Sequence, residues 1–155
     1  MIFGVTSDIL CYALDEAYPW HKKCAPLLQR LRRDFRIAIS PTTVMETYRA
    51  LVRSQKWRPA EARRRLGLLL QHPYVVFLNE TERVCTVALA LESRHDLGSK
   101  NSLVVAGLIS NNIQTLLTGY EKLYSLTKIE WRGSSLSIRN PLKRSRVKRS
   151  PSWNR

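Results

Sequence analysis

Short apolar runs of strand-forming residues alternate along this chain with longer stretches whose apolar residues recur at helical spacing. The strand-like runs cover residues 1–5, 36–39, 74–77, 114–117 and 129–132. The helix-like stretches cover residues 8–14, 19–34, 41–52, 59–70, 79–91 and 99–109, with a short helix or turn over 119–126. This order is typical of a parallel sheet with covering helices. It predicts an α/β protein whose central parallel sheet has about five strands.

Three of the expected helices have marked beginnings. Ser40 stands before Pro41, which is the order of an N-cap followed by a proline at the first helical position. Asn79 is expected to cap the long helix that follows it, and Gly98 leads into the helix that starts at Ser99. We therefore expect each of these helices to begin at or just after the residue named.

The length and composition are those of one globular domain. With 155 residues and 44% hydrophobic residues, the chain is large enough to bury a core. Its apolar runs are shorter than the ~18 residues of a membrane span, and its first residues lack the basic stretch and cleavage site of a secretory signal. We therefore expect a cytoplasmic protein with no membrane contact.

The three cysteines are expected to be buried and reduced. Cys11, Cys24 and Cys85 lie far apart, include no CxxC pair and are odd in number, which argues against a disulfide framework. His21 and Cys24, three residues apart on an expected helix, leave a shared zinc ion open as an alternative, although no second pair with metal-site spacing follows.

Charge is the second strong constraint, because 26 Lys and Arg against 12 Asp and Glu give a formal net charge of +14. A small protein this basic is expected to bind a polyanion. From residue 139 to the end there are seven basic residues and no acidic one. Residues 143–155 have almost no apolar content, so they are predicted to form a basic, unstructured C-terminal extension to a domain of residues 1–142.

Two groups of arginines in the body of the chain are predicted to contact phosphate. Like charges this close repel each other unless a polyanion neutralises them, and arginine bonds phosphate as a fork. An ordinary solvated face is the alternative. The groups are Arg30, Arg32, Arg33 and Arg36, and Arg58 with Arg63, Arg64 and Arg65. The residues predicted to bind RNA are Arg63, Arg64, Arg65, Lys143, Arg144, Arg146, Lys148, Arg149, Trp153 and Arg155.

Several strings of residues occur in the order and at the spacing of a known family. They are Leu10-Cys11-Tyr12-Ala13-Leu14, Pro19-Trp20-His21, Ile39-Ser40-Pro41-Thr42-Thr43-Val44-Met45-Glu46, His95-Asp96-Leu97-Gly98 and Thr115-Leu116-Leu117-Thr118. From residue 1 to about 142 the chain resembles PIN domains, including the VapC-type toxin ribonucleases. The resemblance implies a three-layer α/β/α fold with an acidic pocket at the carboxyl ends of the central strands. Carboxylates in such pockets hold Mg²⁺ or Mn²⁺ and activate water for phosphodiester hydrolysis.

Most positions that the resemblance assigns to metal-binding acids hold other residues here. The family's aspartates fall on Thr6, Asn101, Tyr120 and Lys122, and only the helix glutamate is kept, as Glu46. Asp8, Asp96 and Glu121 stand nearby as candidate substitutes. One or two carboxylates beside an ammonium make a poor Mg²⁺ site. The predicted residual pocket has no catalytic residue and no metal, and it comprises Thr6, Asp8, Glu46, Asn101, Tyr120 and Glu121.

Each of these residues also has a structural role open to it. Glu46 is equally explained as the partner of Arg49 or Arg53 on its own helix. Asp8 is explained as a helix cap. Packing or other structural roles are expected for Tyr120, Trp131, His72 and His95.

The function predicted from the sequence is that of a catalytically degraded PIN-like protein that binds RNA as a stable part of the ribosome or another large ribonucleoprotein. It is predicted to be no enzyme, to need no cofactor, and to have ribosomal RNA and ribosomal proteins as partners. The alternative is an active Mg²⁺- or Mn²⁺-dependent endoribonuclease of the toxin type with a rearranged acid set of Asp8, Glu46 and Glu121. An adaptor for an acidic protein also stays open, and a homodimer is a less favoured arrangement.

Overall fold

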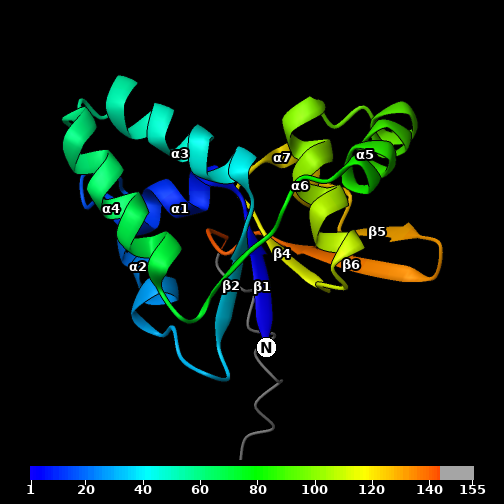
Figure 1. Cartoon of the computed structure of the whole chain (residues 1–155), viewed down its shortest axis with the longest axis horizontal. Coiled ribbons are helices and arrows are strands. Elements are labelled where there is room, and N and C mark those ends of the chain that lie inside the picture. The colour runs from blue at the N-terminus through cyan, green and yellow to red at the C-terminus, as the bar shows by residue number, and fades with distance from the viewer. Residues whose placement is uncertain (144–155) are drawn as a thin grey trace, which may run out of the picture.

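The computed structural model describes residues 1–143, which contain one six-stranded sheet and seven helices (Figure 1). The strands are β1 (Ile2–Val5), β2 (Arg36–Ile39), β3 (Val75–Phe77), β4 (Thr115–Leu117), β5 (Lys128–Trp131) and β6 (Ser134–Arg139). The helices are α1 (Ser7–Leu14), α2 (His21–Gln29), α3 (Pro41–Arg53), α4 (Pro59–Gln71), α5 (Glu82–His95), α6 (Ser99–Ser110) and α7 (Glu121–Tyr124). The strand order is β3-β2-β1-β4-β6-β5, and all neighbours are parallel except the β5–β6 hairpin.

Helices cover both faces of the sheet (Figure 1). Helices α1 to α4 pack on one face around a core that includes Leu51, and α5 to α7 pack on the other around a core that includes Leu91. Strand β2 shows the division, because Ile37 and Ile39 belong to the first core and Ala38 to the second. The sheet is therefore buried on both sides, as parallel sheets usually are.

The central strand β1 has no room for a side chain at Gly4. This residue pairs with Ala38 of β2 on one side and with Leu116 of β4 on the other. A Cβ atom on it would lie 2.5 Å from Cδ2 of Leu108, a fully buried residue of α6. The missing side chain lets the last turn of α6 pack directly on the middle of the sheet.

The predicted fold class is confirmed, and the five expected strands lie within one or two residues of their predicted positions. The sixth strand, β6, was not predicted. Its sequence, SSLSIR, is rich in serine and has only two buried apolar residues, Leu136 and Ile138. It pairs with β4 and β5, so the chain after Gly133 returns to the sheet instead of leaving it.

Two helix boundaries differ from the sequence prediction. The helix expected over 19–34 is shorter, because the chain turns after α2 and the backbones of Arg32 and Phe35 exchange two hydrogen bonds of 3.0 Å. Thr81 caps α5 in place of Asn79, since its side chain accepts a hydrogen bond from the Val84 N–H. The predicted cap of α3 is confirmed, because the Ser40 hydroxyl accepts a hydrogen bond from the backbone N–H of Thr43 in the first turn of the helix.

Cys11 and Cys24 are buried as predicted, but Cys85 is exposed on α5, so the prediction is wrong for that residue. The ring nitrogen Nδ1 of His21 lies 2.8 Å from the Tyr12 carbonyl oxygen, which accounts for this histidine without a zinc ion. Within residues 1–143, no helix is both long and apolar enough to cross a membrane.

Candidate functional site

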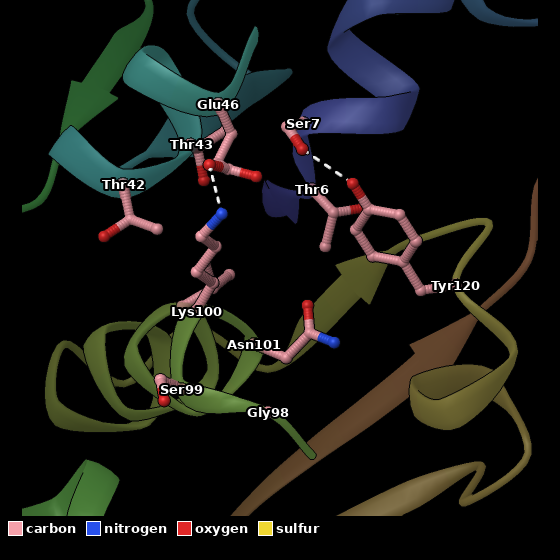
Figure 2. Close-up of a pocket in the computed structure, with 11 residues that line it drawn as sticks. Thr6, Ser7, Thr42, Thr43, Glu46, Gly98, Ser99, Lys100, Asn101 and Tyr120 are labelled. Carbon is pink, nitrogen blue, oxygen red and sulfur yellow. Dashed lines mark hydrogen bonds and ion pairs between the residues drawn. The ribbon is translucent and has the colours of Figure 1, made fainter. Parts of the chain in front are cut away.

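A pocket of about 380 Å³ opens at the carboxyl ends of the central strands, between the first turns of α3 and α6 (Figure 2). Strands β1, β2 and β4 are parallel, so the residues that follow them meet at one edge of the sheet. Most of the lining side chains are uncharged and polar. The lining residues are Thr6, Ser7, Thr42, Thr43, Glu46, Gly98, Ser99, Lys100, Asn101, Val104 and Tyr120.

One ion pair spans this pocket. Glu46 lies in the second turn of α3 and Lys100 in the first turn of α6, and Nζ of Lys100 is 2.7 Å from Oε1 of Glu46 (Figure 2). The Lys100 side chain is 62% exposed and that of Glu46 29%. The expected pairing of Glu46 with Arg49 or Arg53 is therefore replaced by a pair between two helices. Of the residues that line the pocket, Glu46 alone has a carboxylate.

Asp8 does not line the pocket, but it joins two segments that contribute lining residues. Its carboxylate accepts hydrogen bonds from the Thr6 hydroxyl and, at 2.9 Å, from the backbone N–H of Gly119. The Thr6 hydroxyl also lies 2.9 Å from that of Thr118. Burial raises the pKa of Asp8 above 3.8, against the opposing effect of these hydrogen bonds. Asp8 thus ties the end of β1 to the segment that follows β4.

Tyr120 and Ser7 form the wall across the pocket from Glu46 and Lys100, and the phenol oxygen of Tyr120 lies 2.7 Å from Oγ of Ser7 (Figure 2). Burial raises the pKa of Tyr120 to about 12; the bond to Ser7 acts against the shift, and the charges of Asp8, Cys11 and Glu46 add to it. At neutral pH the phenol is therefore protonated and is able to donate a hydrogen bond. Although half-buried, its side chain faces the pocket and does not serve as core packing alone.

The structure brings together only part of the predicted residual pocket. Thr6, Glu46, Asn101 and Tyr120 line it, whereas Asp8 and Glu121 do not. Asn101 projects toward the pocket from α6 while its amide nitrogen donates to the Leu97 carbonyl oxygen at 3.0 Å (Figure 2). The remaining candidate acids are exposed: Glu121 opens α7 and Asp96 caps the end of α5. The proposed acid set of Asp8, Glu46 and Glu121 is therefore not assembled.

Comparison of acidic positions alone missed several pocket residues. Lys100 comes directly before Asn101, the position that the resemblance assigns to an acid, so its place in the sequence was a usable signal. Thr42 and Thr43 follow the predicted cap and proline at the end of β2, which also puts them at this edge. What the sequence did not indicate is that α3 and α6 face each other there.

The predicted RNA-binding arginines of α4 point in different directions. Arg64 pairs with Glu61 at 2.8 Å, and the Arg65 guanidinium lies 5.8 Å from the centre of the Trp57 ring. Arg63 lines a separate apolar groove between α3 and α4. Lys143 lies 4.4 Å from the centre of the Tyr124 ring. The other predicted RNA-binding residues lie outside residues 1–143: Arg144, Arg146, Lys148, Arg149, Trp153 and Arg155.

The PIN domain family model matches residues 7–128. This chain belongs to the PIN domain family. The match includes the central strand β4 and both helices that face each other across the pocket, so the family to which the sequence was compared is confirmed. A search of curated protein sequences finds no match to this PIN domain protein.

Solved structures with the same fold include toxins and toxin–antitoxin complexes. VapC20 of Mycobacterium tuberculosis, a sarcin-ricin loop cleaving toxin, is 18% identical with a TM-score of 0.62 over 75% of this chain and 87% of that one. VapBC2 from Rickettsia felis, bound to a DNA fragment from its promoter, is 18% identical with a TM-score of 0.64 over 90% and 98%. A toxin–antitoxin complex from Klebsiella pneumoniae is 15% identical with a TM-score of 0.61 over 89% and 96%. At these identities the likeness is one of fold.

These findings correct the function predicted from the sequence. The prediction of a structural ribosomal component is wrong, because the solved structures found with this fold include a toxin and a toxin–antitoxin complex. Ribosomal partners are not supported by these comparisons. The prediction that the protein is no enzyme is wrong on the same comparisons. Missing acids at family positions do not establish a loss of activity. The alternative, a nuclease of the toxin type, is therefore the function proposed below.

The prediction of no metal cofactor is also wrong for a member of this family, for which the resemblance implies Mg²⁺ or Mn²⁺. Whether the side chains fit such an ion is a separate matter. Within residues 1–143 no group of three or more His, Cys, Asp or Glu side chains is placed to hold a metal ion. The pocket offers the single carboxylate of Glu46, already paired with an ammonium. This arrangement does not fit a hard divalent ion, so no chemical step below is assigned to one.

Proposed function

We propose that this protein acts on RNA as a nuclease of the toxin type, and that the pocket between α3 and α6 receives the scissile phosphodiester. The observation that carries the proposal is the position of Glu46, a half-buried carboxylate in a pocket at the carboxyl ends of parallel strands. This is where open α/β sheets place their sites. The net charge of +14 favours a polyanionic substrate.

The reaction is hydrolysis of a phosphodiester. A water oxygen forms a bond to phosphorus, the bond from phosphorus to one sugar oxygen breaks, and that oxygen takes a proton from solvent. In the proposal Glu46 takes the proton of the water as a general base. Tyr120, kept protonated by its raised pKa of about 12, donates a hydrogen bond to an oxygen of the reacting phosphate.

The test is cleavage of labelled RNA by the full chain, with Mg²⁺, with Mn²⁺ and with chelator. We expect Glu46→Gln to lower the cleavage rate by about 10²- to 10⁴-fold, the usual contribution of a general base. Glu130→Gln is the matched control, because Glu130 also pairs with a lysine, Lys128, but lies on β5 outside the pocket. Equal rates for the two variants, or no cleavage under any of these conditions, would contradict the proposal.

A nuclease of the toxin type is also expected to arrest cell growth and to bind a protein partner. We propose that an antitoxin-like protein restrains this chain, an extension supported by the toxin–antitoxin complex that shares its fold. Expression of the chain alone in a bacterial host is then expected to arrest growth, and expression of Glu46→Gln is not. Arrest by both proteins would show that the effect does not depend on the pocket.

A further inference from the structure

Lys100 is the most informative charged group of the pocket, because its charge is opposite to that of the acids expected there. Its ammonium is 2.7 Å from the one carboxylate of the pocket and belongs to a different helix. The pair therefore leaves the pocket close to neutral, where a lone carboxylate would repel an incoming phosphodiester. Neutralisation of Glu46 is the first effect of Lys100.

The pair is also easy to separate. The Lys100 side chain is 62% exposed, and an ion pair so open to water contributes little to stability. A lysine has a long, flexible stem and three hydrogens to donate, so its ammonium is able to change partner when another anion arrives. The two helices do not depend on this contact, because α6 is held on the sheet by buried residues such as Leu108 and α3 by Leu51.

The neighbours of Lys100 suit a phosphodiester. Ser99 and Asn101, on either side of it in the sequence, line the same pocket, as do Thr42 and Thr43. These groups are uncharged, and a further carboxylate at this edge belongs to Glu80, which accepts from the backbone N–H of Thr42 at 2.9 Å and from its hydroxyl but does not line the pocket. A phosphate oxygen is thus able to reach the Lys100 ammonium from the open side of the pocket.

We propose that Lys100 changes partner when RNA binds, from the Glu46 carboxylate to the scissile phosphate. In the free protein it neutralises Glu46. In the complex it contacts a phosphate oxygen, and Glu46 is released to accept the proton of water. This proposal rests on the nuclease function above and names the residue that recognises the substrate's charge.

The test measures binding of a short, fluorescein-labelled, 2′-O-methylated single-stranded RNA by anisotropy over a range of salt concentrations. We expect Lys100→Met to weaken binding several-fold and to lower the slope of log affinity against log salt by about 0.7, the value for one phosphate contact on a single strand. Lys100→Arg keeps the charge and the slope. Glu46→Gln keeps the slope and tightens binding, because the ammonium no longer has to leave a carboxylate.

Lys128→Met is the matched control, since it also removes a lysine that is paired with a glutamate, at 2.6 Å, but outside the pocket. An unchanged slope in Lys100→Met, an equal fall in Lys128→Met, or weaker binding by Glu46→Gln would overturn the proposal. If the pair only joined α3 to α6, Lys100→Met and Glu46→Gln would lower the melting temperature alike and leave the slope unchanged, which also overturns it.

The two proposals fail in different ways. Lys100-dependent binding of RNA that is never cut refutes the nuclease function and the release of Glu46 for catalysis. Cleavage that depends on Glu46 but proceeds at the wild-type rate in Lys100→Met, with an unchanged salt slope, refutes the role of Lys100 and leaves the nuclease function standing.

Discussion

Replacement of Asp8 tests whether this residue stabilises the fold around the pocket, a role that does not require contact with a substrate. Asp8→Ala leaves the Gly119 N–H without its acceptor at a half-buried position and removes the partner of the Thr6 hydroxyl. An unsatisfied buried donor costs about 1–3 kcal/mol, and the relief of a buried charge offsets part of this. We expect a net loss of about 2 kcal/mol, which for a chain of 155 residues lowers the melting temperature by about 4–8 °C.

The effect has a defined dependence on pH. Because burial holds the pKa of Asp8 above 3.8 in the folded protein, the folded state binds this proton more tightly than the unfolded state. The stability that Asp8 contributes is therefore fully present below pH 3.8 and is partly lost as the pH rises through the raised pKa. The gap in melting temperature between the wild type and Asp8→Ala should narrow from acidic to neutral pH.

Thermal unfolding followed by circular dichroism provides the measurement. Asp34→Ala is the control, because Asp34 is an exposed aspartate paired with Arg32, and its replacement should change stability by no more than about 0.5 kcal/mol. Gly119→Ala supplies a second perturbation, since a Cβ there would lie 2.5 Å from Oδ2 of Asp8. Its cost should be smaller when Asp8 is already alanine. An unchanged melting temperature in Asp8→Ala, or a gap that widens as the pH rises, would refute this reasoning.

Two further predictions concern packing and thiol chemistry. Gly4→Ala should lower the free energy of unfolding in urea by about 1–3 kcal/mol, because Leu108 of α6 packs on this residue. Gly67→Ala is the control: no atom lies within 4 Å of the new Cβ, so it should stabilise α4 by about 0.5–1 kcal/mol. An unchanged free energy of unfolding in Gly4→Ala would contradict the packing described. Ellman's reagent should modify Cys85 quickly in the native protein, because this thiol is exposed. It should modify Cys11 and Cys24 slowly, because burial shields both thiols and raises the pKa of Cys11 to about 12 and that of Cys24 to about 11. Fast reaction of all three thiols would show that the core is open.

The fold was predictable from the sequence because alternating strands and helices in a parallel sheet leave a repeated local signal. Strand β2 is an uninterrupted apolar run after Arg36, and the start of α3 is marked by Ser40 and Pro41. Strand β6 gave no such signal, since serines occupy half of it and its buried positions are only Leu136 and Ile138. Its place in the sheet comes from pairing with distant strands, which a local pattern does not record.

The pocket was predictable in part, and only through the family. Thr6, Glu46, Asn101 and Tyr120 meet there because the sheet topology brings the ends of their elements together. Whether an acid points into the pocket or behind it depends on side-chain direction, so Asp8 was not placed by its position in the sequence. The ion pair of Glu46 was equally out of reach, because its partner lies on another helix.

The step from sequence to function went wrong at the acids. Neutral residues at Thr6 and Asn101 describe a departure from the family's usual metal ligands. They do not show what the remaining groups do, so a loss of activity does not follow from them. The position of Lys100, beside the retained glutamate, indicates that charges in the pocket have been rearranged as well as removed.

The strand order sets a sequence of events during synthesis of this chain. Strand β1 is made first but lies in the middle of the sheet, and its pairing of Gly4 with Leu116 must wait until residue 116 has been added. At ~5–20 residues per second this interval is roughly 6–22 seconds. Until then one edge of a hydrophobic central strand stays without its neighbour, which makes the nascent chain open to mispairing and to chaperones that bind exposed strands.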